Sequence, residues 1–168
     1  MLGPLYKDER AGIKIAPPAG SRIISRAGLE VVSFVQDQKQ WGGSIERIEL
    51  NDPQTVEQYL QLTANDMSKT FSAVQILQSQ KTTFDGKPAG RLTASMEGSA
   101  ASAQGGGQPV QIAILRQQLL VQTAPKEYMV LTLFSPLKDR EMATRTVEAM
   151  IGSYEIMDAT TLLKRRAA

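Results

Sequence analysis

The side chains that most often do chemistry in enzymes are missing from this sequence. Its 168 residues include no histidine and no cysteine. A serine–histidine–aspartate triad, a thiol nucleophile, a thiolate zinc site and a disulfide each lack at least one required residue. A hydrolase would have to pair a serine or tyrosine with a lysine or glutamate base, and no motif in the sequence supports that arrangement.

Three carboxylates lie close together in the chain, at Glu46, Glu49 and Asp52. Glycosidases need two carboxylates held roughly 5–9 Å apart across a substrate. Glu46 and Glu49 are three residues apart on an expected strand, so they face opposite sides of it. We expect Asp52 to cap the following helix. These acids therefore predict no catalytic pair.

Loops that bind metals or phosphates are not predicted either. The chain contains no calcium loop of the D-x-[DN]-x-[DN]-G type. The run Gly105-Gly106-Gly107 is not followed by Lys-Ser/Thr, and it leads into a strand rather than into a helix N-terminus that could hold an anion. We therefore expect a protein that is not an enzyme and that carries no cofactor and no metal.

A polar stretch with one large aromatic residue is the candidate interaction surface. Gln36, Gln38 and Gln40 alternate at a period of two, which predicts one wet strand face, and Trp41 follows them beside two glycines. Exposed aromatic residues are common in the centres of protein interfaces. Two alternatives stay open: the glutamines are simply solvated, and Trp41 packs over a sheet edge.

The seven methionines of the chain allow two interpretations. Methionine is flexible and polarisable, so a cluster of them suits an adaptable pocket for a small apolar ligand between sheet and helix. The alternative is that they fill the core. The residues concerned include Met67, Met96, Met129, Met142 and Met150.

Charge and hydropathy limit the partners. The net charge is +2, with Lys164, Arg165 and Arg166 together near the C-terminus, so the balance favours neither nucleic acid nor an anionic membrane. No stretch approaches the roughly 20 apolar residues of a membrane span, and no signal peptide is visible. The lack of cysteine fits both a cytosol and an envelope without disulfides.

The elements expected from the sequence alternate little between helix and strand. Strands are predicted at 13–15, 29–35, 44–50, 71–83, 91–96 and 128–134. Residues 110–122 are predicted as one long strand or as two strands with a kink at Gln117-Gln118, and a final short strand at 153–157 stays open. Helices are predicted from the Asp52-Pro53 signal to Lys69 and over 138–152, where Ser135-Pro136 repeats the signal. Residues 98–109 read as a flexible hairpin loop. Clustered strands with hairpin turns predict an α+β protein with an antiparallel sheet of about six to eight strands and two helices packed on it.

Three stretches resemble the PsbP-like superfamily. Gly12-Ile13-Lys14-Ile15-Ala16-Pro17-Pro18-Ala19-Gly20 is similar to its opening pattern, and Phe84–Arg91 is similar to its central hairpin. Tyr128–Leu133, with Ile151-Gly152-Ser153-Tyr154 after a helix, resembles its closing pattern. Together they cover nearly the whole chain in the family's order. The superfamily includes photosystem assembly proteins, bacterial lipoproteins of the DcrB and LpqN types, and a nuclear Ran-binding protein.

The resemblance implies a single α/β/α sandwich domain over residues 1–158, followed by a tail at 159–168. It also implies a non-catalytic binding or assembly module, working through a sheet face or a loop end with a protein partner. A periplasmic or envelope location is favoured through the resemblance, while a cytoplasmic one stays open. The alternative function is a carrier of a small apolar ligand.

Overall fold

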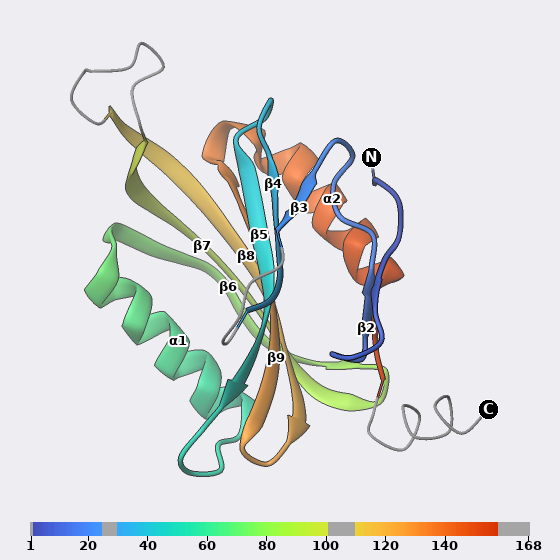
Figure 1. The fold of residues 1–168 in the computed structure, drawn as a ribbon. Coiled ribbons are helices and arrows are strands. Elements are labelled where there is room, and N and C mark those ends of the chain that lie inside the picture. The colour runs from blue at the N-terminus through green and yellow to red at the C-terminus, as the bar shows by residue number, and fades with distance from the viewer. Residues whose placement is uncertain (1, 25–29, 101–109, 158–168) are drawn as a thin grey trace.

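The computed structural model describes residues 2–24, 30–100 and 110–157, and shows two sheets and two main helices (Figure 1). Of the loop expected at 98–109, residues 98–100 instead extend strand β7, and residues 101–109 lie outside the described residues, as does the expected tail at 159–168. The elements are β1 (Tyr6–Asp8), β2 (Ile13–Ile15), β3 (Arg22–Ile24), β4 (Glu30–Gln36), β5 (Trp41–Glu49), α1 (Val56–Thr70), β6 (Ser72–Phe84), β7 (Lys87–Ala100), β8 (Val110–Ala124), β9 (Glu127–Pro136), the short 3-10 helix η1 (Leu137–Asp139), α2 (Arg140–Ser153) and β10 (Glu155–Ile156).

Seven strands form one antiparallel sheet in the order β3-β4-β5-β9-β8-β7-β6. The expected α+β class with an antiparallel sheet and two helices is confirmed. The first predicted strand, 13–15, instead belongs to a separate three-stranded sheet of order β1-β2-β10. Residues 110–124 form one continuous strand, which decides between the one-strand and two-strand readings of that segment.

The two helices lie on opposite sides of the large sheet (Figure 1). Each side has its own hydrophobic core. Side chains of α1 pack with Leu92, Leu120 and Tyr128 on one face, whereas α2 and β2 pack with Trp41 and Ile45 on the other. A sheet with a hydrophobic core on each face is expected when one amphipathic helix packs on each side of it.

This two-sided burial explains the phase of the apolar residues in β5. Ile48 follows Ile45 by three positions, which by alternation predicts a bulge in this strand. However, β5 pairs with β9 without a shift, so Ile45 and Ile48 lie on opposite faces, and each faces one of the two cores. The register shift lies instead on the β4 side of β5, between Glu30 and Val32.

The starts of both helices differ from the sequence prediction. Helix α1 begins at Val56, three residues after Pro53, and Thr55 is its N-cap. The Thr55 hydroxyl accepts from the Gln58 amide at 3.2 Å, and the Gln58 side chain accepts from the Thr55 amide at 2.9 Å. This reciprocal capping box replaces the expected cap by Asp52. At α2, Pro136 ends β9 rather than beginning the helix.

One glycine allows α1 to approach the sheet closely. A Cβ on Gly90 of β7 would lie 2.9 Å from a Leu60 methyl carbon, so the absence of a side chain there makes room for α1. Phe71 ends the helix, and β6 follows at once as the edge strand. The helix therefore crosses β6 and β7 near that edge and is joined to the sheet at its C-terminal end.

Candidate binding groove

The residues proposed from the sequence as an interaction surface do not share one exposed face. Trp41 is 2% exposed and Gln36 is 5% exposed, whereas Gln38 and Gln40 are exposed. Residues 37–40 form a turn between β4 and β5, so the expected strand alternation does not occur there. Only Gln38 and Gln40 are accessible to a partner, and a surface built on them stays a prediction.

The two buried members of that set have structural contacts. Gln36 donates to the Ala19 carbonyl at 3.2 Å and accepts from the Lys39 amide at 2.9 Å. The indole Nε1 of Trp41 donates to Asp139 at 2.9 Å, and the Lys39 ammonium lies 4.9 Å from the Trp41 ring centroid. Trp41 is therefore a core residue of β5, which is an interior strand, rather than an exposed contact residue or a side chain lying over a sheet edge.

The methionines are mainly core residues. Met67, Met96, Met129 and Met150 are buried, and Met142 is half exposed. Met67 alone among them lines one of the depressions described below. A methionine-lined pocket for an apolar ligand therefore receives no support from their positions.

A groove of about 410 Å³ lies between α1 and the face of the large sheet. Its floor comes from the middle of β5, β8 and β9, and its wall from the side of α1 that faces them. Polar and apolar groups both reach it. The lining residues are Glu46, Ile48, Tyr59, Thr63, Asp66, Met67, Thr70, Phe71, Arg116, Gln118 and Val130.

Arg116 is the central charged group of the floor. Its guanidinium carbon lies 5.3 Å from the Phe134 ring centroid, and its Nε is buried without a hydrogen-bond partner among the described residues. Burial lowers the pKa of Arg116, while the nearby Glu46 carboxylate acts in the opposite direction. None of the ion pairs between described residues includes Arg116 or Glu46.

Gln118 lies two residues further along β8, on the same face of the sheet. It is 2% exposed. Its Nε2 donates to the Thr132 hydroxyl at 2.9 Å, while its Oε1 is buried and has no partner among the described residues. Both unpaired atoms are buried, so they lie beneath the surface of the groove rather than open to it.

Tyr59, which lines the groove, stacks on the buried Tyr128. The rings of Tyr59 and Tyr128 lie 4.2 Å apart between centroids, and the Tyr128 hydroxyl donates to the Gln54 carbonyl at 2.8 Å. Burial, with smaller contributions from the Glu46, Tyr128 and Asp66 charges, raises the pKa of Tyr59 to about 12. The Tyr59 hydroxyl is therefore a neutral group at ordinary pH.

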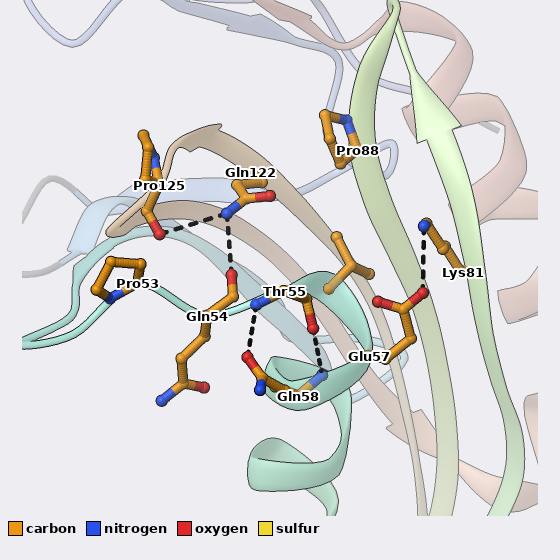
Figure 2. Close-up of a pocket in the computed structure, with 10 residues that line it drawn as sticks. Pro53, Gln54, Thr55, Glu57, Gln58, Lys81, Pro88, Gln122 and Pro125 are labelled. Carbon is orange, nitrogen blue, oxygen red and sulfur yellow. Dashed lines mark hydrogen bonds and ion pairs between the residues drawn. The ribbon is translucent and has the colours of Figure 1, made fainter.

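A second depression, of about 350 Å³, lies at the N-terminus of α1 (Figure 2). Its polar groups already bind one another. Gln122 donates to the carbonyls of Gln54 and Pro125 at 3.0 and 3.3 Å, and Lys81 pairs with Glu57 at 3.2 Å. The capping box occupies the first turn of the helix. Because these partners are satisfied, this depression is a weaker candidate than the groove.

Sequence reasoning considered Glu46 only as a possible catalytic partner of Glu49, and it missed Arg116 and Gln118. The structure places Glu46 in the groove and leaves Glu49 exposed outside its lining. The available signal was the polar run Arg116-Gln117-Gln118 inside an otherwise apolar strand. The sequence does not say which of these three side chains reaches a groove, because that depends on which parts of the two sheet faces α1 and α2 cover.

No group of three or more aspartates and glutamates lies close enough together to hold a metal ion in the part of the chain that is described. Within the same residues, no helix is both long enough and apolar enough to cross a membrane.

Comparison with known proteins gives structural matches but none by sequence. No protein-family model matches the chain, and no curated protein matches it in sequence. Among solved structures, CyanoP, the cyanobacterial PsbP of Synechocystis sp. PCC 6803, matches with a TM-score of 0.62 at 14% identity, covering 91% of each chain. The Ran-binding protein Mog1p of Saccharomyces cerevisiae matches with a TM-score of 0.62 at 11% identity, covering 96% of this chain and 99% of its own.

LpqN of Mycobacterium tuberculosis, a protein involved in cell envelope biogenesis, is the third such structure. It matches with a TM-score of 0.56 at 12% identity, and the match covers 87% of this chain and 83% of LpqN. These likenesses extend over nearly the whole chain and agree with the resemblance of its opening, central and closing stretches. The chain has the PsbP-like fold.

Proposed function

We propose that the chain is a non-catalytic binding module that takes hold of a protein partner through the groove between α1 and the sheet. The observation that carries the proposal is the lining of the groove, where Glu46, Asp66 and Arg116 come together beside apolar side chains. None of these three charged groups forms an ion pair with another described residue. Charged groups that surround an apolar centre are typical of protein interfaces.

The character of the lining supports a protein partner over an apolar ligand. Glu46, Asp66 and Arg116 all reach the groove, and a purely apolar molecule would have to desolvate them without compensation. A nucleic acid is also disfavoured, because two acids and one base offer little attraction to phosphates. Mog1p, which shares the fold, is a Ran-binding protein.

The location of the module stays a prediction. LpqN is involved in cell envelope biogenesis and Mog1p binds Ran, so proteins of this fold do not all serve one process. We propose a bacterial envelope location on the strength of LpqN. Fractionation of the native cells, followed by detection of the chain with an antibody, tests it. Recovery in the cytoplasmic fraction alone would contradict it.

Site-specific photo-crosslinking in the native cells tests the binding proposal. A photo-reactive phenylalanine analogue is placed at Thr63, which lines the groove, and separately at Arg145, which is exposed on α2 on the opposite side of the sheet. We expect a discrete adduct from position 63 and none of the same size from position 145. Equal adducts from both positions, or none from position 63, would count against the groove.

A matched pair of helix variants separates groove occupancy from general surface contact. Asp66 lines the groove, whereas Ser68, two residues away on the same helix, is exposed and does not line it. Asp66→Trp is expected to abolish the position-63 adduct by filling the groove mouth, and Ser68→Trp is expected to preserve it. Loss with both variants, or with neither, would contradict the proposal.

A further inference from the structure

We infer that the long edge strand of the large sheet, β6, pairs with β6 of a second copy of this chain. Two seven-stranded sheets then join across a two-fold axis into one continuous antiparallel sheet. The surface concerned is distinct from the groove, because no residue of β6 lines the groove.

The two edges of the large sheet differ in their protection. Strand β3 has three residues, and its Arg22 pairs with Asp37 at 2.7 Å, whereas β6 has 13 residues. No residue of β6 is buried, and beyond its ladder with β7 its backbone forms no hydrogen bond to another described residue. Short strands and charged side chains commonly prevent an edge from pairing with another chain. The β3 edge is therefore protected, and the β6 edge is open.

The second half of β6 is regular and almost uncharged. The shifts of register in its ladder with β7 all lie before Gln78, so residues 78–84 form an unbroken run. Lys81 is the only charged residue of the strand, and its ammonium already pairs with Glu57 of α1 at 3.2 Å. Bulges and unpaired lysines are common obstacles to strand addition, and this run contains neither.

The turn after β6 determines which of its backbone groups are free. Asp85 and Gly86 both have positive φ, as in a two-residue hairpin turn, and the residues that flank such a turn exchange both hydrogen bonds. Pairs of this kind alternate along an antiparallel ladder, so the even-numbered residues of the run 78–84 direct their backbone groups toward β7. The odd-numbered residues direct theirs away from β7, where a further strand can pair with them.

An open antiparallel edge is complementary to itself. A two-fold axis perpendicular to the sheet turns the row of free donors and acceptors end for end, so the free groups of one copy face those of the other. The same row in a second copy is regular, free of proline and almost free of charge. The occupant that this edge specifies is therefore a second copy of the chain.

Charge and strand length select the register of the pairing. A register centred on Lys81 would place two lysines opposite each other, and like charges directly opposite destabilise a pair of strands. A register centred on Thr82 would run off the strand into the turn at Asp85. Centring on Gln80 avoids both problems, because it places Gln80 opposite Gln80 of the partner subunit and Ser79 opposite Lys81 of the partner subunit.

The pairing has a consequence for binding, and this consequence alone rests on the proposed function. A two-fold axis perpendicular to the joined sheet leaves α1 and the groove of both copies on the same face. Two grooves on one face allow two segments of one partner assembly to bind together, which raises the overall affinity when both are reached.

Sedimentation equilibrium of the full chain measures the pairing. We expect a monomer–dimer equilibrium with a dissociation constant on the order of 10–100 µM, as suits a small and mostly polar contact. A chain that stays monomeric at every concentration up to about 1 mM would overturn the inference and would leave a strand of another protein as the occupant of the edge.

Single cysteines test the register, since the chain has none of its own. In the pairing centred on Gln80, the Cα atoms of the two residues 80 lie about 4.5 Å apart, within the range for a disulfide. The two residues 78 are separated by roughly 13 Å along the strand, which is too far. Gln78 and Gln80 are both exposed and alternate onto the same face of β6, so Gln78→Cys is a matched control for Gln80→Cys.

Gln80→Cys is expected to form a covalent dimer under mild oxidation at least about fivefold faster than Gln78→Cys does. Non-reducing electrophoresis of timed samples measures both rates. Equal rates at the two positions, or no covalent dimer from position 80, would contradict the pairing.

A pair of lysine variants tests the centre of the contact. Gln80→Lys places two ammonium groups opposite each other and is expected to weaken dimerisation at least about fivefold. Thr144→Lys adds the same charge at an exposed position of α2 and is expected to leave dimerisation unchanged. Unaltered dimerisation in Gln80→Lys would count against the inference. If this variant fails to fold, the cysteine pair and the sedimentation of the native chain decide.

The pairing and the groove fail separately, since they involve different surfaces. Crosslinking from position 63 in a chain that sediments as a monomer would retain the binding module and reject the pairing. A dimer with the expected cysteine preference but no adduct from position 63 would do the reverse.

Discussion

The buried indole N–H of Trp41 has one hydrogen-bond acceptor, the carboxylate of Asp139. Trp41 is the only tryptophan of the chain, and its indole nitrogen donates to the Asp139 carboxylate at 2.9 Å. Asp139 occupies the N-cap position of α2 but makes no side-chain capping bond. The carboxylate therefore stabilises the core through Trp41 rather than through the helix amides.

We predict that Asp139→Ala lowers the free energy of unfolding by about 1.5–3 kcal/mol, because a buried indole N–H would lose its charged acceptor. Asp139→Asn keeps an acceptor oxygen and is expected to cost less than about 1 kcal/mol. Urea denaturation followed by Trp41 fluorescence measures both variants. An unchanged midpoint for Asp139→Ala would mean that the bond contributes nothing to stability.

At the scale of the element, the start of α1 is set by a reciprocal pair rather than by the nearest acid. Thr55→Ala removes the side-chain half of the capping box and is expected to destabilise the protein by about 1 kcal/mol. Thr55→Ser retains the hydroxyl and should be close to neutral. Thermal or chemical denaturation gives the difference.

Asp52→Ala is the informative control for this helix. Asp52 is exposed and precedes the N-cap by three residues, so its replacement is expected to change stability by less than about 0.5 kcal/mol. If Asp52→Ala cost more than Thr55→Ala, the helix in solution would begin where the Asp52-Pro53 signal puts it, and the capping box would be excluded.

At the scale of the whole molecule, the absence of histidine and the burial of tyrosines determine how stability depends on pH. No side chain of the sequence has an ordinary pKa between about 5 and 8. Burial raises the pKa of Tyr59 to about 12, and burial raises the pKa of Tyr154 and of Tyr128 as well. Folding therefore favours the protonated form of these three groups.

We predict a free energy of unfolding that is nearly constant from about pH 6 to 9 and falls above about pH 10. In that upper range the unfolded chain loses tyrosine protons that the folded chain retains, so the stabilisation is present below pH 10 and is lost as the pH rises through about 12. Tyr59→Phe should make the fall shallower. A decline between pH 6 and 8 would contradict the prediction.

Local patterns were sufficient for most of the elements. Alternation and hairpin turns predicted the strands from residue 71 onward, and apolar spacing predicted both helices, because these periods reflect one residue's neighbours in its own segment. The α+β class followed from their order, and the PsbP-like fold was implied by the resemblance of three stretches of sequence. Strands β1 and β3 were missed, because neither Tyr6-Lys7-Asp8 nor Arg22-Ile23-Ile24 alternates apolar and polar residues as Ile13-Lys14-Ile15 of β2 does.

The absence of histidine and cysteine limited the chemistry before any coordinate was considered. What only the tertiary structure decided was which side chains share a space. Trp41 and Asp139 are 98 positions apart in the chain, and the groove joins Glu46 of β5 with Arg116 of β8 and Asp66 of α1. Contacts of this kind depend on the order of the strands and on where each helix packs on the sheet. Both are determined by the burial of apolar side chains from segments far apart in the chain, and not by local conformational preference.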